Sequence, residues 1–322
     1  MLRLWFAGAL LLALLAHPLA AAEEVAFHNG QTKLTGTLYL PPGRGPHPAI
    51  VVLHAANGAT RDYFAYRHLI DALPAAGFAV LLYDRRGSGA STGDFTTATF
   101  QDLAADAIAG VSYLETRKDI RRHRIGVWGL SQGGWIASLA AATSGAIAFL
   151  ISVSGPGVTP AAQMDYTASY ALKADGESPD IIARALKVRE VVNDYYRGHQ
   201  TLEKAEEAVG GIRGEAWFRY VSLPNGGNLP ADPAKTKWFR VMDYEPLRAL
   251  ARVRVPSLFI FAETDEYVPV DVSIEKIKTA MAGKPVTIQR IAGSDHYMSC
   301  GSATCPAYVA ALLRWLQTAP DR

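Results

Sequence analysis

A serine between two glycines is the first candidate for chemistry. Residues 129–133 read Gly-Leu-Ser-Gln-Gly, the form G-x-S-x-G. They follow the apolar run Ile125 to Trp128, which is typical of a buried strand, and precede the helix-like segment Trp135 to Ala142. A serine at a sharp strand-to-helix turn presents its hydroxyl above the edge of the sheet. The pattern predicts that Ser131 is a nucleophile; the alternative is a glycine-rich turn with a serine of no chemical role.

A serine hydroxyl needs a general base, and histidine is the usual one. Among the eight histidines, His296 lies just past the predicted strand Val286 to Ile291, in a loop at the edge where Ser131 is expected. We therefore expect His296 to be the base, with a surface histidine of no catalytic role as the alternative. His54 ends an earlier strand, and we expect it to hold its loop in place rather than to transfer protons.

The imidazole in turn needs a carboxylate on its other nitrogen, which fixes the tautomer and stabilises the imidazolium. Three acidic residues follow the apolar run 257–261: Glu263, Asp265 and Glu266. Asp265 is four residues beyond that run, far enough to turn toward the edge loop, and is the predicted acid. Asp295, beside the histidine, is the competing candidate, although the side chains of adjacent residues usually diverge.

Negative charge that develops on a carbonyl oxygen calls for backbone N–H donors that are already in place. The amide of Gln132, the residue after the nucleophile, is the first expected donor. The second should come from the loop after the strand that ends at Leu53, which reads His-Ala-Ala-Asn-Gly over 54–58. We expect Ala56 to supply it and hold Ala55 as the reserve.

The elements that must position these residues alternate along the chain. A hairpin is predicted over 25–40, because two β-prone runs flank an Asn-Gly turn. Buried strands are then predicted at 49–53, 78–83, 125–129, 148–152, 257–261 and 286–291, with helices at 67–76, 100–115, 135–142, 272–281 and 306–317. This order predicts an α/β fold, with a mainly parallel sheet and helices on both faces.

The alternation stops over residues 156–251. This segment has helix-like stretches, Asp180 to Tyr196 and Leu202 to Val209, but no buried-strand run. We expect it to be a helical cap inserted into a single domain that spans 23–322. Its aromatic residues are not enriched over the rest of the chain, so they do not indicate which ligand it binds.

The first 22 residues are typical of a secretory signal. Arg3 precedes an apolar run from Leu4 to Ala16, and small residues follow at Ala20 and Ala22. We predict cleavage after Ala22 and export to the periplasm or the medium. An uncleaved membrane anchor is the alternative, but the run is shorter than the about 20 apolar residues that a spanning helix needs, and no later segment is long enough.

Composition excludes several classes of partner. The formal charge is +2, from 32 Lys+Arg and 30 Asp+Glu, and no long run of like charge occurs. Nucleic-acid binding is therefore not expected. The short basic cluster 121–124 is expected to be a solvated turn. The sequence does not indicate an oligomeric state.

Two cysteines, Cys300 and Cys305, lie shortly after His296. In an exported protein we expect a local disulfide that stiffens the loop bearing the base. A zinc site formed by His296 and both cysteines is the alternative, although it lacks a further ligand and would occupy the base. Two free thiols are the remaining alternative.

Taken together, these residues resemble the α/β-hydrolase superfamily over nearly the whole mature chain. Residues 83–91 are similar to its D-x-R-G-x-G-x-S turn, residues 256–269 to its acid loop, and the order Ser131, Asp265, His296 to its nucleophile-acid-base order. Gly133-Gly134 and the short acid-to-base spacing look like the secreted esterase and serine-aminopeptidase-like branches. One departure is His54-Ala55, where the family usually has His-Gly.

The resemblance implies an acyl-serine hydrolase without a cofactor. We expect it to cleave a carboxylic ester through an acyl intermediate on Ser131, with a small ester or a short peptide-like molecule as substrate. An aminopeptidase or amidase with the same three residues is one alternative. A binding module on the same fold, without catalysis, is another.

Overall fold

The computed structural model describes residues 21–318 and is built around one large sheet. Its strands are β1 (Ala21–Asn29), β2 (Thr32–Leu40), β3 (His47–Leu53), β4 (Ala79–Tyr83), β5 (Ile120–Leu130), β6 (Leu150–Val153), β7 (Ser257–Ala262) and β8 (Val286–Ile291). They pair in the order β1-β2-β4-β3-β5-β6-β7-β8. The pairs β1-β2 and β2-β4 are antiparallel. All pairs from β4-β3 to β7-β8 are parallel. The predicted α/β class is confirmed.

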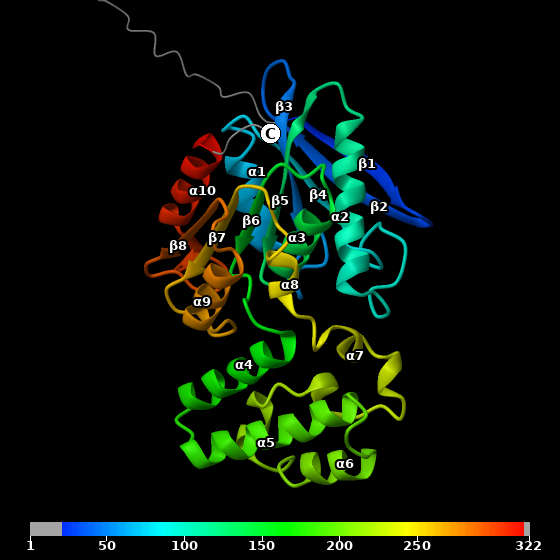
Figure 1. Cartoon of the computed structure of the whole chain (residues 1–322), viewed down its shortest axis with the longest axis vertical. Helices are drawn as coiled ribbons and strands as arrows, with labels where there is room; N and C mark the ends of the chain where they lie inside the picture. Colours follow the sequence, from blue (N-terminus) through cyan, green and yellow to red (C-terminus); the bar gives the residue numbers. More distant parts are fainter. Residues whose placement is uncertain (1–20, 319–322) are drawn as a thin grey trace, which may run out of the picture.

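Both faces of the sheet are covered by helices (Figure 1). The helices that flank the sheet are α1 (Arg67–Ala72), α2 (Phe100–Glu115), α3 (Gln132–Thr143), α8 (Pro246–Leu250), α9 (Val270–Ala280) and α10 (Pro306–Thr318). Alternate residues of β3 separate two cores: Val51 packs in the core of α2, α3, α8 and α9, while Val52 packs in the core of α1 and α10. Successive side chains of a strand point to opposite faces, so an uninterrupted apolar strand fills both cores.

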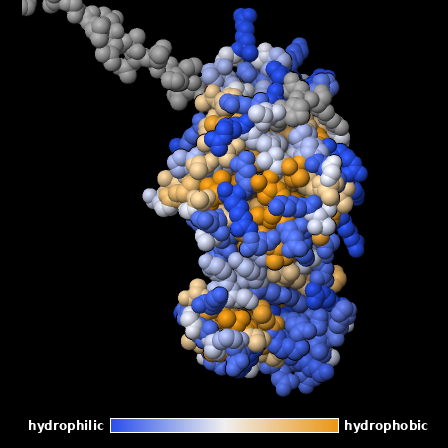
Figure 2. Space-filling model, turned by 60° about the vertical axis from the view of Figure 1, so that its left-hand side comes forward, coloured by the Kyte–Doolittle hydropathy of each residue, from blue (hydrophilic) through white to orange (hydrophobic). Residues whose placement is uncertain are grey.

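Four further helices lie between β6 and β7 and form a separate layer at one end of the molecule (Figure 1). They are α4 (Pro160–Ala174), α5 (Pro179–Tyr196), α6 (Leu202–Gly210) and α7 (Lys237–Val241), with single 3₁₀ turns η2 (Ala216–Tyr220), η3 (Pro224–Gly227) and η4 (Pro233–Lys235). We call residues 156–245 the cap and the remaining described residues the body; the predicted cap, 156–251, also included α8, which packs against α3 and α9 of the body. The cap has its own apolar core around Leu172, Val192 and Trp217. On the face shown in Figure 2 the surface is mainly hydrophilic, with separate apolar areas on body and cap.

Two segments that the sequence analysis singled out are residues 121–124 and the predicted signal peptide. The basic cluster 121–124 is not a turn: it belongs to β5, because that strand begins at Ile120 and pairs with β3 across an irregularity between His47 and Ala49. The predicted signal peptide, residues 1–22, lies outside the described residues except for Ala21 and Ala22, which open β1. Within residues 21–318, none of the helices is both long enough and apolar enough to cross a membrane.

Candidate active site

Ser131 stands at a strained turn between β5 and α3. Its backbone has φ 55° and ψ −118°, a region that non-glycine residues rarely adopt and that occurs mainly at functional sites. The turn is tight: a Cβ at Gly129 would lie 2.0 Å from the carbonyl oxygen of Gly133, and one at Gly133 would lie 2.5 Å from that of Leu53. The Ser131 N–H donates to the Val153 carbonyl at 2.8 Å. Glycines therefore flank this serine because the backbone leaves no room for side chains.

Asp265 and His296 form a buried pair at the ends of β7 and β8. The imidazole Nδ1 lies 2.9 and 2.8 Å from the two carboxylate oxygens of Asp265, and both residues are almost fully buried. Asp265 Oδ1 also accepts the backbone N–H groups of Tyr267 and Val268, both at 2.9 Å. The backbone of His296 is held as well, because Ser154 Oγ donates to the His296 carbonyl at 2.8 Å. Since Nδ1 faces the carboxylate, Nε2 is left for another partner.

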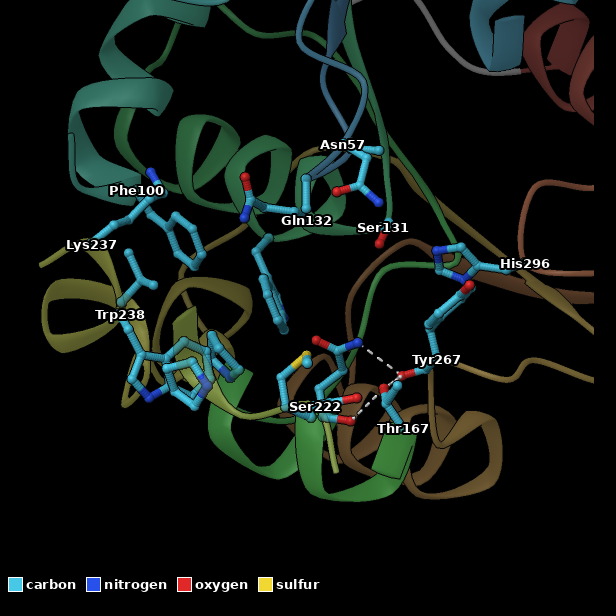
Figure 3. A pocket seen from close by; sticks show the side chains of 18 of the residues that line it. Asn57, Phe100, Ser131, Gln132, Thr167, Ser222, Lys237, Trp238, Tyr267 and His296 are labelled. Atoms are coloured by element: carbon cyan, nitrogen blue, oxygen red, sulfur yellow. Dashed lines mark hydrogen bonds between the residues drawn. The ribbon is translucent and has the colours of Figure 1, made fainter. Parts of the chain in front are cut away.

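Ser131 and His296 line the same cavity, which has a volume of about 530 Å³ and lies between the body and the cap. Figure 3 shows the Ser131 hydroxyl and the imidazole on the same side of this cavity, pointing toward one another. The structure thus brings together three residues that are far apart in the sequence. An aligned serine, imidazole and carboxylate have the composition of a nucleophile, its base and the group that orients the base.

The other acidic candidates have structural partners instead. Asp295 Oδ1 accepts the backbone N–H groups of Tyr297 at 3.0 Å and Ser299 at 2.7 Å, so it organises the loop after β8. Glu263 accepts the N–H of Gly293 at 2.8 Å. Neither carboxylate is bonded to the imidazole.

Hydrogen bonds hold the loop 54–58 and occupy several of its backbone N–H groups. The N–H of Ala55 donates to the Tyr66 hydroxyl at 2.9 Å, and that hydroxyl donates to the Gly58 carbonyl at 2.9 Å. Ala55, the reserve oxyanion donor, therefore already has a partner. Within residues 21–318 the N–H groups of Ala56 and Gln132 have no protein acceptor, and Gln132 is the first residue of α3, where an N–H has no partner within the helix. These two residues line the cavity.

His54 holds the start of this loop. Its Nε2 lies 2.5 Å from the carbonyl oxygen of Tyr83, and burial lowers the pKa of the imidazole to about 4. The ring is therefore neutral at neutral pH, and its N–H donates to that carbonyl. This geometry gives His54 a structural contact between β3 and β4.

Arg85 holds the same loop through its carbonyls. The guanidinium donates to the Ala55 and Ala56 carbonyls at 3.3 and 3.0 Å, and its central carbon lies 3.4 Å from the centroid of the Phe95 ring. Burial lowers the pKa of Arg85 to about 10, so it stays charged at neutral pH. Fixing both carbonyls fixes the peptide planes, and with them the direction of the Ala56 N–H.

The cap reaches this arrangement through Lys237. Its Nζ lies 3.4 Å from the centroid of the same Phe95 ring and donates to the carbonyls of Phe95 and Ala98, each at 3.2 Å. Two cationic groups this close to one centroid occupy opposite faces of the ring. Burial, and next the charge of Arg85, lower the pKa of Lys237 to about 7. We call Arg85, Phe95 and Lys237 the cation stack.

Helix α4 of the cap contacts the acid loop. The Tyr166 hydroxyl donates to the Asp265 carbonyl at 2.9 Å. Gln163 Nε2 and Thr167 Oγ1 donate to the Tyr267 carbonyl at 2.9 and 3.2 Å (Figure 3). The cap therefore contacts the site at two places, the acid loop and the cation stack.

Cys300 and Cys305 are joined by a disulfide that closes the loop after His296. Around it, β9 (Ser299–Cys300) and β10 (Ala303–Thr304) form a short antiparallel pair. Because both sulfurs are bonded to each other, the zinc and free-thiol alternatives do not apply to this structure.

Several residues at the site were not predicted from the sequence. Arg85 stands at the variable position of the D-x-R-G turn, whose arginine is Arg86, so the motif does not mark it. Phe95, Lys237, Tyr66 and Gln163 carry no local signal, because their contacts join segments that are far apart in the chain.

The chain is similar to known hydrolases. The sequence pattern of the Alpha/beta hydrolase family matches residues 50–312. The quorum-quenching protein AidA of Acinetobacter baumannii is 28% identical over 257 residues, which are 77% of this chain and 80% of that protein. Among solved structures, an esterase of Pyrococcus furiosus superposes with a TM-score of 0.60 at 17% identity, covering 93% of this chain and 92% of that one. A dienelactone hydrolase of Anabaena variabilis superposes with a TM-score of 0.54 at 16% identity, covering 94% and 99%. The chain belongs to the alpha/beta hydrolase family.

Proposed function

We propose that this hydrolase is an exported serine esterase that cleaves carboxylic esters through an acyl-serine intermediate. The observation that carries the proposal is the buried Asp265–His296 pair, whose imidazole shares a cavity with Ser131 on its strained turn. A catalytically idle serine would not require beside it a buried histidine hydrogen-bonded to a carboxylate, or a backbone conformation of this cost.

The proposed reaction has two halves. His296 Nε2 takes the proton of Ser131 as the serine oxygen attacks the ester carbonyl, and Asp265 stabilises the resulting imidazolium. The N–H groups of Ala56 and Gln132 hold the negative oxygen of the tetrahedral intermediate. When the C–O bond breaks, His296 gives its proton to the leaving alcohol. Water then repeats these steps on the acyl-serine and releases the carboxylic acid.

The lining of the cavity disfavours a cationic substrate. Its wall includes Phe100, Trp135, Trp238 and the amine-bearing Lys237, and none of the described lining residues is acidic. An aminopeptidase must bind a charged α-amino group, for which a carboxylate is the usual partner. The absence of an acidic residue from this described lining favours an ester over an aminoacyl substrate.

Covalent labelling and paired substrates test the proposal. A fluorophosphonate probe should label the protein, and Ser131→Ala should abolish labelling. Ser138→Ala is the matched control, because this serine is buried in α3 and donates to the Gly134 carbonyl. The native protein should hydrolyse p-nitrophenyl esters and leave aminoacyl anilides intact. Labelling that persists in Ser131→Ala would contradict the mechanism, and hydrolysis of anilides in preference to esters would favour the amidase alternative.

Export is a separate part of the proposal. The signal-like residues 1–22 and the disulfide support it, since disulfides persist in oxidising compartments. Expression of the full chain in a bacterium, followed by fractionation and N-terminal sequencing, should give a periplasmic or secreted protein that begins at Glu23. Recovery of the uncleaved chain in the cytoplasm would contradict export without touching the proposed chemistry.

A further inference from the structure

The active-site cavity has two different ends, and Ser131 lies between them. Figure 3 shows Phe100, Lys237 and Trp238 at one end, and His296 and Tyr267 at the other. The inference below rests on the proposed function, because it uses the direction in which an ester must lie across these two ends.

The proposed chemistry fixes that direction. His296 must protonate the leaving oxygen, so this oxygen has to come within hydrogen-bonding distance of Nε2. The acyl carbon stays bonded to Ser131, and its substituent extends away from the imidazole. The leaving group therefore occupies the end formed by His296, and the acyl group occupies the end formed by Phe100 and Trp238.

Aromatic rings surround the leaving-group end. Tyr267 and Tyr297 both line the cavity and meet the His296 ring edge to face, with centroids 4.9 and 5.2 Å away. Phe64 extends this group outward, 5.5 Å from Tyr297 and 4.7 Å from Tyr63. We call Phe64, Tyr267 and Tyr297 the aromatic rim.

Two members of the aromatic rim are unusually exposed. Phe64 is 63% exposed, which is the largest value among the exposed large hydrophobic side chains of the described residues, and Tyr267 is 37% exposed. Exposed apolar side chains that gather beside a cavity mark a surface that a ligand covers. The cap contributes no aromatic ring within contact of Phe64 in the described residues, so its outer face is left for a ligand.

The rim is also held in place before a ligand arrives. The Tyr267 carbonyl accepts hydrogen bonds from Gln163 and Thr167 of the cap, and the Tyr297 N–H donates to Asp295. Burial, and next a hydrogen bond to Tyr63, raise the pKa of the Tyr297 hydroxyl. Rings that are already ordered lose little conformational entropy when a flat group packs against them.

We propose that the aromatic rim is a binding subsite for an aromatic leaving group, so that the substrates are esters of phenols or other aryl alcohols. The ester C–O bond is hydrolysed by water to give a carboxylic acid and the free aryl alcohol, which receives its proton from His296. Each aromatic contact with offset or edge-to-face geometry is expected to raise kcat/KM by about twofold to tenfold.

Two acetate esters whose leaving groups have similar acidity separate ring recognition from leaving-group chemistry. Phenyl acetate carries a ring, and hexafluoroisopropyl acetate does not. The native protein should show a higher kcat/KM for phenyl acetate, by roughly tenfold. Phe64→Ala and Tyr267→Leu should each lower this ratio by about threefold to tenfold. The readout is the ratio of the two rates and not either rate alone, because a loss that is common to both esters divides out of the ratio.

Phe239→Ala is the matched control, since Phe239 is 43% exposed on α7 and does not line the cavity. Its ratio should equal that of the native protein. Equal kcat/KM for the two esters in the native protein would contradict the aromatic subsite. A ratio of kcat/KM values that is unchanged in both Phe64→Ala and Tyr267→Leu would contradict it as well, and neither result would contradict the proposed esterase activity. Failure of the native protein to hydrolyse any ester would instead overturn the proposed function.

Discussion

The body and the cap contribute to the active site in different ways. In the body, Asp265, His296 and the loop 54–58 are held by buried side chains and backbone hydrogen bonds. The cap reaches the site through few contacts, from Gln163, Tyr166 and Thr167 on α4 and from Lys237 on α7. The difference indicates that the body fixes the reacting groups, while the cap closes the cavity over the substrate. Substitutions in the body should therefore change kcat, and those in the cap should change stability or KM.

The largest expected effect comes from the acid of the body. Asp265→Asn should lower kcat by about 10⁴-fold, because the amide cannot hold the imidazole in the required tautomer. Asp295→Asn is the control: it keeps the acceptor oxygen for Tyr297 and Ser299, and its kcat should stay within a factor of two to three. Steady-state kinetics on p-nitrophenyl acetate measure both. Equal losses in the two variants would mean that Asp265 is not the group that orients the base.

The oxyanion loop should be next in sensitivity. Arg85→Lys should lower kcat by about 10- to 100-fold with little change in KM, since the shorter lysine lacks the planar guanidinium that stacks on Phe95 while its Nη1 donates to both carbonyls. Arg86→Lys is the matched control, because Arg86 pairs with Asp106 at 2.6 Å and does not touch the loop. If Arg85→Lys raised KM instead of lowering kcat, the side chain would act in substrate binding and not in positioning the amides.

The disulfide should affect stability more than chemistry. The pair Cys300→Ser and Cys305→Ser opens a loop with a sequence separation of 5, and chain entropy predicts a loss of about 2 kcal/mol in the free energy of unfolding. Urea denaturation of the double variant measures this loss. Because Asp265 still holds the imidazole, kcat in the folded protein should fall less than in Asp265→Asn. An unchanged unfolding midpoint would show that the surrounding hydrogen bonds already fix this loop.

The smallest effect on kcat is expected in the cap, where a substitution of Lys237 should instead change how the free energy of unfolding depends on pH. Since the pKa of Lys237 falls from its usual 10.5 to about 7 in the folded protein, the unfolded chain binds more protons between these values. The free energy of unfolding should therefore rise with pH from about 7 to 10, by less than about 1.4 kcal/mol per pH unit. Lys237→Met should remove this slope. Arg85, Arg86, Asp94 and Asp102 are the charged groups around Lys237, and they are unchanged in the variant.

Urea denaturation of the native protein and of Lys237→Met at pH 6, 8 and 10 isolates the contribution of the lysine. Identical pH dependence in both proteins would contradict the burial of this amine against Phe95. A larger effect on kcat than that of Arg85→Lys would contradict the division of roles between body and cap.

Much of the fold could be predicted from the sequence because local patterns determine it. Each of the six predicted sheet strands after the hairpin overlaps an observed one. The buried parallel strands leave apolar runs, whereas the edge strand β8 is only partly buried and was marked by its alternating pattern. The strand over 121–124 was missed for the opposite reason: its side chains are mostly exposed and basic, and it lies between two residues of β5 that pair with β3, Ile120 and Ile125. The helix α4 was also missed, because the break Gly155-Pro156-Gly157 separates it from β6 and ends the alternation on which the other predictions were based.

Some residues of the active site could also be predicted from the sequence, and others could not. Ser131, Asp265 and His296 could be selected because each follows a predicted strand, and the carboxyl ends of parallel strands meet at one edge. The structure places these three together, and their chemical roles remain predictions. The cation stack and the aromatic rim could not be predicted, because Phe95, Lys237 and Phe64 come together only through packing of distant segments.

The close approach of backbones around Ser131 also limits which sequences can encode this protein. Gly129 and Gly133 face carbonyl oxygens at distances no Cβ can occupy, whereas a Cβ at Gly214 would meet nothing within 4 Å. A saturation library should thus return almost only glycine at 129 and 133, and many residue types at 214. The glycines of the motif are then retained by spatial exclusion alone, and they would be invariant even in a descendant that had lost its enzymatic activity.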